Sequence, residues 1–143
     1  MRGISIIALL AAGCASPAAP VLDARGHAGV DRLDEPFAAS SDAARGREVF
    51  VLREAGHCVL CHAAPGMVTV GDVGPSLAGV GSRLTPAQIR YRVADITRLK
   101  PDAAMPAFYR TEGLANVAPS HLGRPVLTAR QVEDVVAFLV TLR

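Results

Sequence analysis

Apolar side chains recur every three or four positions near the C-terminus, a spacing that places them on one face of a helix. The apolar positions are Val132, Val135, Val136, Leu139 and Leu142. Just before them, Thr128 is followed three residues later by Gln131, the pair that caps the free N–H groups at a helix start. The pattern predicts an amphipathic C-terminal helix that packs on another helix.

The same capping pair predicts a second helix in the middle of the chain. Thr85 is followed three residues later by Gln88, and Pro86 occupies the first turn, where its missing N–H costs nothing. The apolar residues that share a face of this helix are Ile89, Val93 and Ile96.

A third helix is predicted from the capping candidates at positions 40–42 to about Glu54. Gly46 and Phe50 lie one turn apart on a single face, so we expect another helix, the C-terminal one, to approach closely at Gly46. No stretch shows strand alternation bounded by hairpin turn signals. The fold class expected is all-α with long loops.

The first residues have the pattern of a secretory signal. Arg2 provides the positive start, residues 4–10 are apolar, and small residues lead to Cys14. The apolar run is too short to span a bilayer as a helix. We therefore expect export to the periplasm.

Two fates of the signal are consistent with this sequence. Residues 10–14 resemble a bacterial lipobox, which would make Cys14 the lipid anchor of a membrane-attached lipoprotein. Ordinary cleavage beyond Cys14, for instance after Ala15 or Ala18, would remove the cysteine. Both alternatives stay open.

Length, composition and charge indicate how the chain is divided and which partners it can bind. We divide it into a signal peptide (1–18), a linker or extended arm (19–40) and one domain (41–143), which suits a length of 143 residues. Half of the residues are apolar but only 4% are aromatic, so a cofactor could fill interior volume. The net charge of +2 is spread along the chain without a basic cluster, so we expect no nucleic-acid partner.

Three cysteines, two of them only three positions apart, argue against a framework of disulfides. Cys58, Cys61 and His62 form the Cys-x-x-Cys-His signature of covalent haem c attachment, in which the thiols bind the porphyrin and the histidine ligates the iron. A zinc site would want four ligands, and a thioredoxin-like dithiol would sit near a βαβ pattern. We expect one haem c, with His57 as a surface residue.

The candidates for the second axial iron ligand are Met67, Met105, His121 and His27. Met67 follows His62 too closely for the chain to reach the opposite haem face easily. Met105 lies before a proline on a loop without helical order, where its side chain can point inward. We expect Met105 to be the ligand and His121 the fallback. Ligation by histidine and methionine leaves no open position for substrate, which suits electron transfer.

Residues 73–83 resemble the Gly-Pro-x-Leu stretch of class I cytochromes c. The resemblance implies a class I cytochrome c-like fold, with N- and C-terminal helices packed around one covalently bound haem. It also implies that the carbonyl group of Pro75 accepts a hydrogen bond from the ring of His62, which fixes the ring and raises its basicity.

Residues 105–114, 117–119, 125–128 and 132–139 resemble the SoxX family of bacterial sulfur-oxidising systems. The resemblance implies a heterodimer with a SoxA-like c-type cytochrome, which contributes the catalytic haem, so that this chain has no catalytic residue. The complex would join thiosulfate to a cysteine of the carrier protein SoxYZ, and this chain would pass the electrons to a soluble acceptor. Residues 63–72 depart from the family pattern.

Two other functions share part of these observations. A free-standing respiratory electron carrier would have the same haem ligands but no stable partner. A haem sensor or peroxidase would have an open iron site. The partner surface is expected to include residues 108–119, with Arg110 and Glu112 as its charged members.

Overall fold

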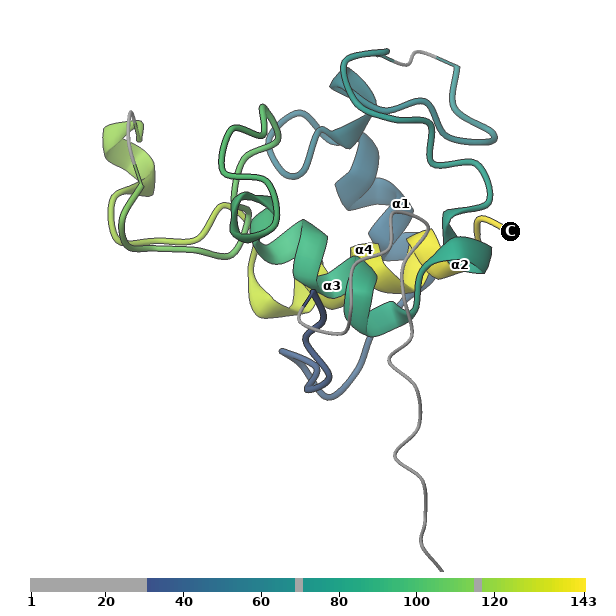
Figure 1. Cartoon of the computed structure of the whole chain (residues 1–143), viewed down its shortest axis with the longest axis horizontal. Helices are drawn as coiled ribbons and strands as arrows, with labels where there is room; N and C mark the ends of the chain where they lie inside the picture. Colours follow the sequence, from purple (N-terminus) through teal and green to yellow (C-terminus); the bar gives the residue numbers. More distant parts are fainter. Residues whose placement is uncertain (1–30, 69–70, 115–116) are drawn as a thin grey trace, which may run out of the picture.

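The structure is a computed structural model that describes residues 31–68, 71–114 and 117–143. The described elements are all helical, as expected, and leave long loops between them (Figure 1). The α-helices are α1 (Ala43–Val51), α2 (Val80–Arg83), α3 (Pro86–Asp95) and α4 (Ala129–Thr141), and three 3₁₀ turns span Cys58–Leu60, Ile96–Arg98 and Pro119–His121. No helix of the described residues is long and apolar enough to cross a membrane. The predicted signal peptide, with Cys14, and the candidate ligand His27 lie outside these residues.

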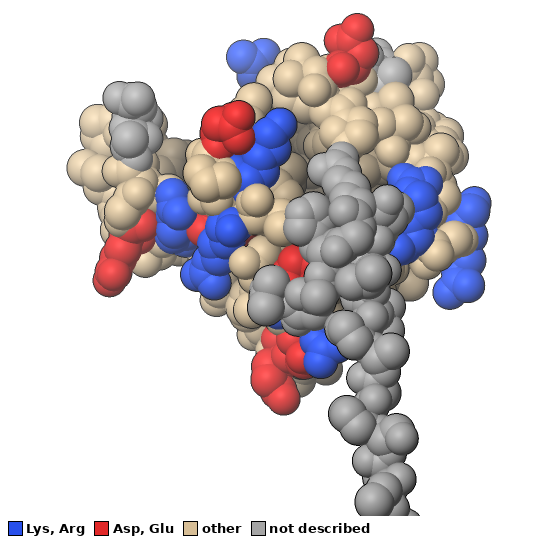
Figure 2. Space-filling view, in the orientation of Figure 1, with Lys and Arg blue, Asp and Glu red and all other residues tan. Residues whose placement is uncertain are grey.

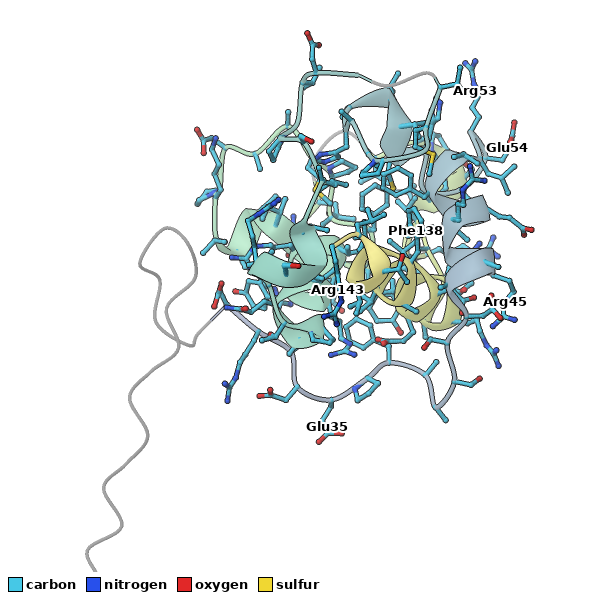
Figure 3. All side chains as sticks on the ribbon, turned by 90° about the vertical axis from the view of Figure 1, so that its right-hand side faces the viewer. Glu35, Arg45, Arg53, Glu54, Phe138 and Arg143 are labelled. Carbon is cyan, nitrogen blue, oxygen red and sulfur yellow. The ribbon has the colours of Figure 1, made fainter. Side chains whose placement is uncertain are left out.

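Helices α1 and α4 pack directly on each other, which confirms the contact expected at Gly46. A Cβ atom built at Gly46 would lie 1.8 Å from the carbonyl oxygen of Asp134, so only glycine fits at this crossing. Next to it, the rings of Phe50 and Phe138 pack edge to face with centroids 5.3 Å apart. In Figure 3 Phe138 lies at the centre of the molecule and Arg45 at its outer edge.

Both predicted capping boxes are present. The hydroxyl oxygen of Thr85 accepts a hydrogen bond from the backbone N–H of Gln88, and the N–H of Thr85 donates to the Gln88 side chain over 3.0 Å. Thr128 and Gln131 form the same pair of bonds at the start of α4, with distances of 3.2 and 2.9 Å. Helix α3 ends at Asp95, so Ile96 begins a 3₁₀ turn and is only half-buried.

Helix α1 begins after Asp42, one of the expected caps, but ends at Val51 instead of about Glu54. The reason lies in the turn that follows. Leu52 leaves the helix in an extended conformation, and its carbonyl oxygen accepts the N–H of His57 over 3.0 Å. The chain is thereby redirected toward Cys58.

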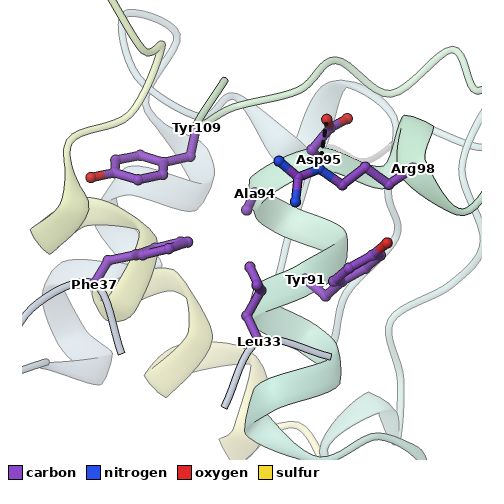
Figure 4. Close-up of a pocket in the computed structure, with 7 residues that line it drawn as sticks. All are labelled: Leu33, Phe37, Tyr91, Ala94, Asp95, Arg98 and Tyr109. Atoms are coloured by element: carbon purple, nitrogen blue, oxygen red, sulfur yellow. Dashed lines mark ion pairs between the residues drawn. The ribbon is translucent and has the colours of Figure 1, made fainter. Parts of the chain in front are cut away.

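The described end of the predicted arm, residues 31–37, lies against α3 and α4. The backbone N–H of Leu33 donates to the carbonyl of Ala87 over 3.0 Å, and the N–H of Phe37 donates to the carboxylate of Glu133 over 3.0 Å. The ring of Phe37 stacks on Tyr109, with centroids 4.3 Å apart (Figure 4). This segment thus braces the loop that follows α3.

Buried carboxylates of α3 and α4 are paired with arginines. Glu133, which is 4% exposed, binds Arg90 through two hydrogen bonds of 2.7 and 2.9 Å. Asp134 likewise binds the guanidinium of Arg45. Because an unpaired buried charge is costly, these bidentate pairs fix how α4 sits against its neighbours. On the face shown in Figure 2, the exposed basic and acidic side chains are interspersed.

Candidate functional site

The 3₁₀ turn Cys58–Leu60 places the three residues of the Cys-x-x-Cys-His motif together. The turn begins after His57, a half-buried residue whose φ of 45° starts the reversal of the chain. The carbonyl oxygen of Cys58 then accepts the N–H groups of Cys61, over 3.1 Å, and of His62, over 2.9 Å. Both cysteines are free and half-buried. Two thiols and one imidazole therefore project from a single turn.

The segment 71–77 runs alongside this turn in the same direction and holds it. Three backbone hydrogen bonds of 2.8 Å join the two segments, from Gly71 to Val59, from Gly74 to Cys61 and from Leu77 to Ala63. Because the partners advance together along both segments, the bonds fix which residues lie beside the imidazole. Those residues are Gly74 and Pro75.

The hydrogen bond from His62 to Pro75 determines which nitrogen of the imidazole carries the proton. Nδ1 of His62 lies 2.7 Å from the carbonyl oxygen of Pro75. A carbonyl oxygen can only accept, so Nδ1 carries the proton and Nε2 of the neutral ring keeps its lone pair for a metal. This is the contact that the resemblance to class I cytochromes c implied, and iron ligation by His62 stays a prediction. The donor set suits a haem iron.

Gly74 allows this approach, a role that the sequence analysis did not assign to it. A Cβ atom built on Gly74 would lie 2.4 Å from Cε1 of His62 and 2.6 Å from Nδ1. The backbone therefore passes against the imidazole ring as closely as glycine permits. The only sequence signal was that a glycine precedes Pro75.

The Cys58 thiol does not have the character of a reactive redox thiol. Burial, together with the neighbouring Cys61 thiol, raises the pKa of Cys58 to about 12. Reactive Cys-x-x-Cys sites work through a thiol whose pKa is lowered instead. Among residues 31–68, 71–114 and 117–143, no group of three or more His, Cys, Asp or Glu side chains could hold a metal ion.

The candidates for the second axial ligand differ in their surroundings. Met105 and Met67 are both half-buried and pack against the apolar core, whereas His121 is exposed. Met105 lies on the loop after α3 and, with His121, lines a cavity of about 330 Å³. The choice of Met105 stays a prediction.

The loop that carries Met105 is anchored at its two ends by Asp95 and Arg110. A guanidinium nitrogen of Arg110 donates to Oδ2 of Asp95 over 3.0 Å, and the Thr97 hydroxyl donates to Oδ1 over 2.5 Å. Burial alone would raise the pKa of Asp95, but the hydrogen bond from Thr97 and the charge of Arg110 outweigh it, and the pKa is lowered. Nearby, the N–H of Tyr109 donates to the carbonyl of Ala94 over 2.9 Å. Arg110 is thus part of an internal ion pair as well as a surface residue.

Comparison with known proteins points to one family. In a comparison with family models, residues 43–143 match cytochrome c. Among solved structures, the crystal structure of SoxXA from P. pantotrophus is similar, with 32% sequence identity and a TM-score of 0.71. The similarity covers 78% of this chain and 90% of that chain.

Two further solved structures are similar to this chain at a lower level. The c-type cytochrome SorU from Sinorhizobium meliloti is 24% identical with a TM-score of 0.42, and the match covers 70% of this chain and 88% of that one. Cytochrome c2 from Paracoccus denitrificans is 20% identical with a TM-score of 0.40, covering 71% and 96%. No curated protein matches the chain significantly in sequence.

Proposed function

This chain belongs to the cytochrome c family as a SoxX-like member, and we propose that it is the electron-transfer subunit of a thiosulfate-oxidising complex. In this proposal it forms a heterodimer with a SoxA-like c-type cytochrome that carries the catalytic haem. The complex joins thiosulfate to a cysteine of a SoxYZ-type carrier protein. The observation that carries the proposal is the similarity to SoxXA, at 32% identity over 90% of the matched chain.

The motif residues have one role each in this proposal. As a cytochrome c, the chain carries one covalently bound haem c, which supplies reversible one-electron chemistry at its iron. Cys58 and Cys61 would hold the porphyrin through thioether bonds, and Nε2 of His62 would bind the iron. The carbonyl oxygen of Pro75 keeps the proton on Nδ1 and makes the ring a stronger ligand.

Met105 would supply the second protein ligand to the iron in this proposal. Ligation by a methionine and a histidine would stabilise the reduced iron and leave no position for a substrate. The chain therefore has no catalytic residue of its own. The ion pair of Asp95 and Arg110, together with Phe37 stacked on Tyr109, keeps the Met105 loop in place against the core.

The chemistry of thiosulfate conjugation requires such a carrier. Joining a thiosulfate sulfur to a cysteine sulfur forms one S–S bond, breaks the S–H bond, and releases one proton and two electrons. A subunit with a single haem accepts one electron at a time, so it turns over twice per bond. It must pass each electron to a soluble acceptor before the next can enter.

The proposal places the chain in the periplasm, on the basis of the signal pattern that ends near Cys14. Mass spectrometry of the mature protein determines the fate of this cysteine. A diacylglycerol adduct on Cys14 at the N-terminus indicates a membrane-anchored lipoprotein. A free N-terminus beyond Cys14 indicates a protein without this anchor.

The test is a pull-down of the tagged chain from its native periplasm. We expect a second haem-staining band in the bound material and reduction of the haem upon addition of thiosulfate with the carrier protein. A monomer whose haem stays oxidised would overturn the complex and leave a free-standing electron carrier. Binding of carbon monoxide to the reduced protein at neutral pH would instead indicate an open iron site, as in a sensor or peroxidase.

A further inference from the structure

A long loop stands out from the helical body between Phe108 and Leu127. These two residues are buried, and the N–H of Leu127 donates to the carbonyl of Phe108 over 3.0 Å, so the chain leaves and returns at one point. We call residues 111–114 and 117–126 the side lobe. Figure 1 shows it projecting away from the helices, on the side opposite to the C-terminus.

The side lobe contributes little to the core. Its described residues are exposed or half-buried, and the N–H groups of His121 and Arg124 bond locally, to the carbonyls of Ala118 and His121. Ordering a residue costs about 1 to 2 kcal/mol of conformational entropy, and ordered loops of this length are usually functional. We therefore expect the side lobe to have a function other than stabilising the fold.

A cavity of about 330 Å³ lies between the side lobe and the Met105 loop. An apolar cavity of about 150 Å³ holds a benzene molecule, so this one has room for a large apolar side chain. Its apolar lining from the side lobe consists of Leu114, Val117, Ala118 and Val126. Its apolar lining from the Met105 loop consists of Ala103, Ala104, Met105, Pro106 and Ala107.

The polar lining of the cavity carries positive charge. Arg110 forms a 3.0 Å ion pair with Asp95, which also pairs with Arg98 over 3.4 Å. Arg124 is exposed and forms no ion pair with any other described residue, and His121 lies beside it in the lining. The positive charge of Arg124, at the edge of the cavity, favours binding of a carboxylate from a partner protein.

We propose that this cavity receives an apolar side chain, flanked by a carboxylate, from the second c-type cytochrome of the complex. The inference rests on the proposed function and names the surface through which that partner binds. The apolar side chain fills the cavity, and the carboxylate pairs with Arg124. Because Met105 forms part of the wall, a bound partner also touches the loop that carries the candidate iron ligand.

The test compares variants of the full haem-loaded chain in binding to the partner cytochrome. Val117→Asp places a charge in the apolar lining and should weaken binding about 100-fold, which corresponds to about 2.7 kcal/mol. Arg124→Glu reverses the rim charge and should weaken it about 10-fold, with a smaller loss at high salt because ions screen the repulsion. We choose Arg124 because replacing Arg110 would also break the internal pair with Asp95.

The matched control is Arg143→Glu, the same charge reversal at an exposed residue at the C-terminus, on the opposite side of the molecule (Figure 1). It should bind the partner as the wild type does. The haem absorption spectrum and the unfolding midpoint of each variant show whether it is folded. If Val117→Asp fails to fold, Val117→Gln replaces it, with a weaker effect in the same direction.

The possible results separate the two proposals. If the wild type binds a second c-type cytochrome and both folded lobe variants bind it as tightly, the cavity is not the docking site and the proposed function stands. If the wild type binds none, both proposals fail. Self-association of the wild type that Val117→Asp abolishes would make a second copy the occupant and overturn the inference.

Discussion

Replacing Gly46 by alanine tests the packing of α1 on α4 most directly. The added Cβ would lie 1.8 Å from the carbonyl oxygen of Asp134, about 1.6 Å short of the 3.4 Å at which ordinary contact begins. The obstacle is backbone, so it cannot rotate away. The two helices must move apart or tilt.

The expected loss of folding stability follows from the cost of moving the two helices apart. Overpacking a core costs about 1 to 3 kcal/mol, and the rigid carbonyl places this site at the upper end, at about 3 kcal/mol. For a domain of this size the unfolding midpoint should fall by about 12 to 24 °C. Helix propensity alone predicts the opposite sign, because alanine is favoured over glycine inside a helix by about 1 kcal/mol.

The control is the reverse substitution at an exposed position of the same helix, Ala44→Gly. It should destabilise the protein by at most about 1 kcal/mol through propensity alone, because Ala44 lies in the first turn of the helix. Unfolding by guanidinium, followed by circular dichroism on the haem-loaded protein, measures both variants. A Gly46→Ala protein that is as stable as the wild type, or more stable, would refute the close crossing.

Three further predictions concern the site. Gly74→Ala should push the ring of His62 aside and shift the haem spectrum and reduction potential, because the added Cβ would lie 2.4 Å from the ring; an unchanged spectrum would contradict this close approach. Met105→Ala should open the iron to carbon monoxide in the reduced protein while Met67→Ala does not, and the reverse result would move the ligand to Met67. Asp95 has a pKa lowered from 3.8, so its stabilisation is complete above that value and is lost as the pH falls through the folded pKa. Asp95→Asn should therefore be less stable than the wild type at pH 7, and the difference should shrink below about pH 4 in urea unfolding series; a pH-independent difference would contradict this.

The local chemistry of the sequence determined most of the helices. A threonine followed by glutamine three residues later caps a helix whatever surrounds it, so the starts of α3 and α4 were predicted correctly. The spacing of apolar residues likewise identified the face of α4 that is buried. Gly46 could be singled out because a glycine on an apolar helix face indicates close approach of a second element.

The end of α1 could not be predicted in this way. Residues 52–54 contain no residue type that breaks a helix. The helix ends at Val51 because the chain turns there, and the carbonyl of Leu52 accepts a hydrogen bond from the N–H of His57. The short helix α2 was also missed. It holds its place because the N–H of Gly81 donates to the carbonyl of Leu142, at the far end of the chain.

In the candidate site, the sequence by itself determined the haem motif, because the reach of two thiols and an imidazole depends on their spacing along the chain. Only the tertiary structure decided which groups support the loop that carries Met105. Asp95 and Arg110 are fifteen residues apart, and Phe37 meets Tyr109 across most of the domain. Contacts between distant residues leave no periodic signal, because they depend on how the helices pack and not on the neighbours of each residue in the chain.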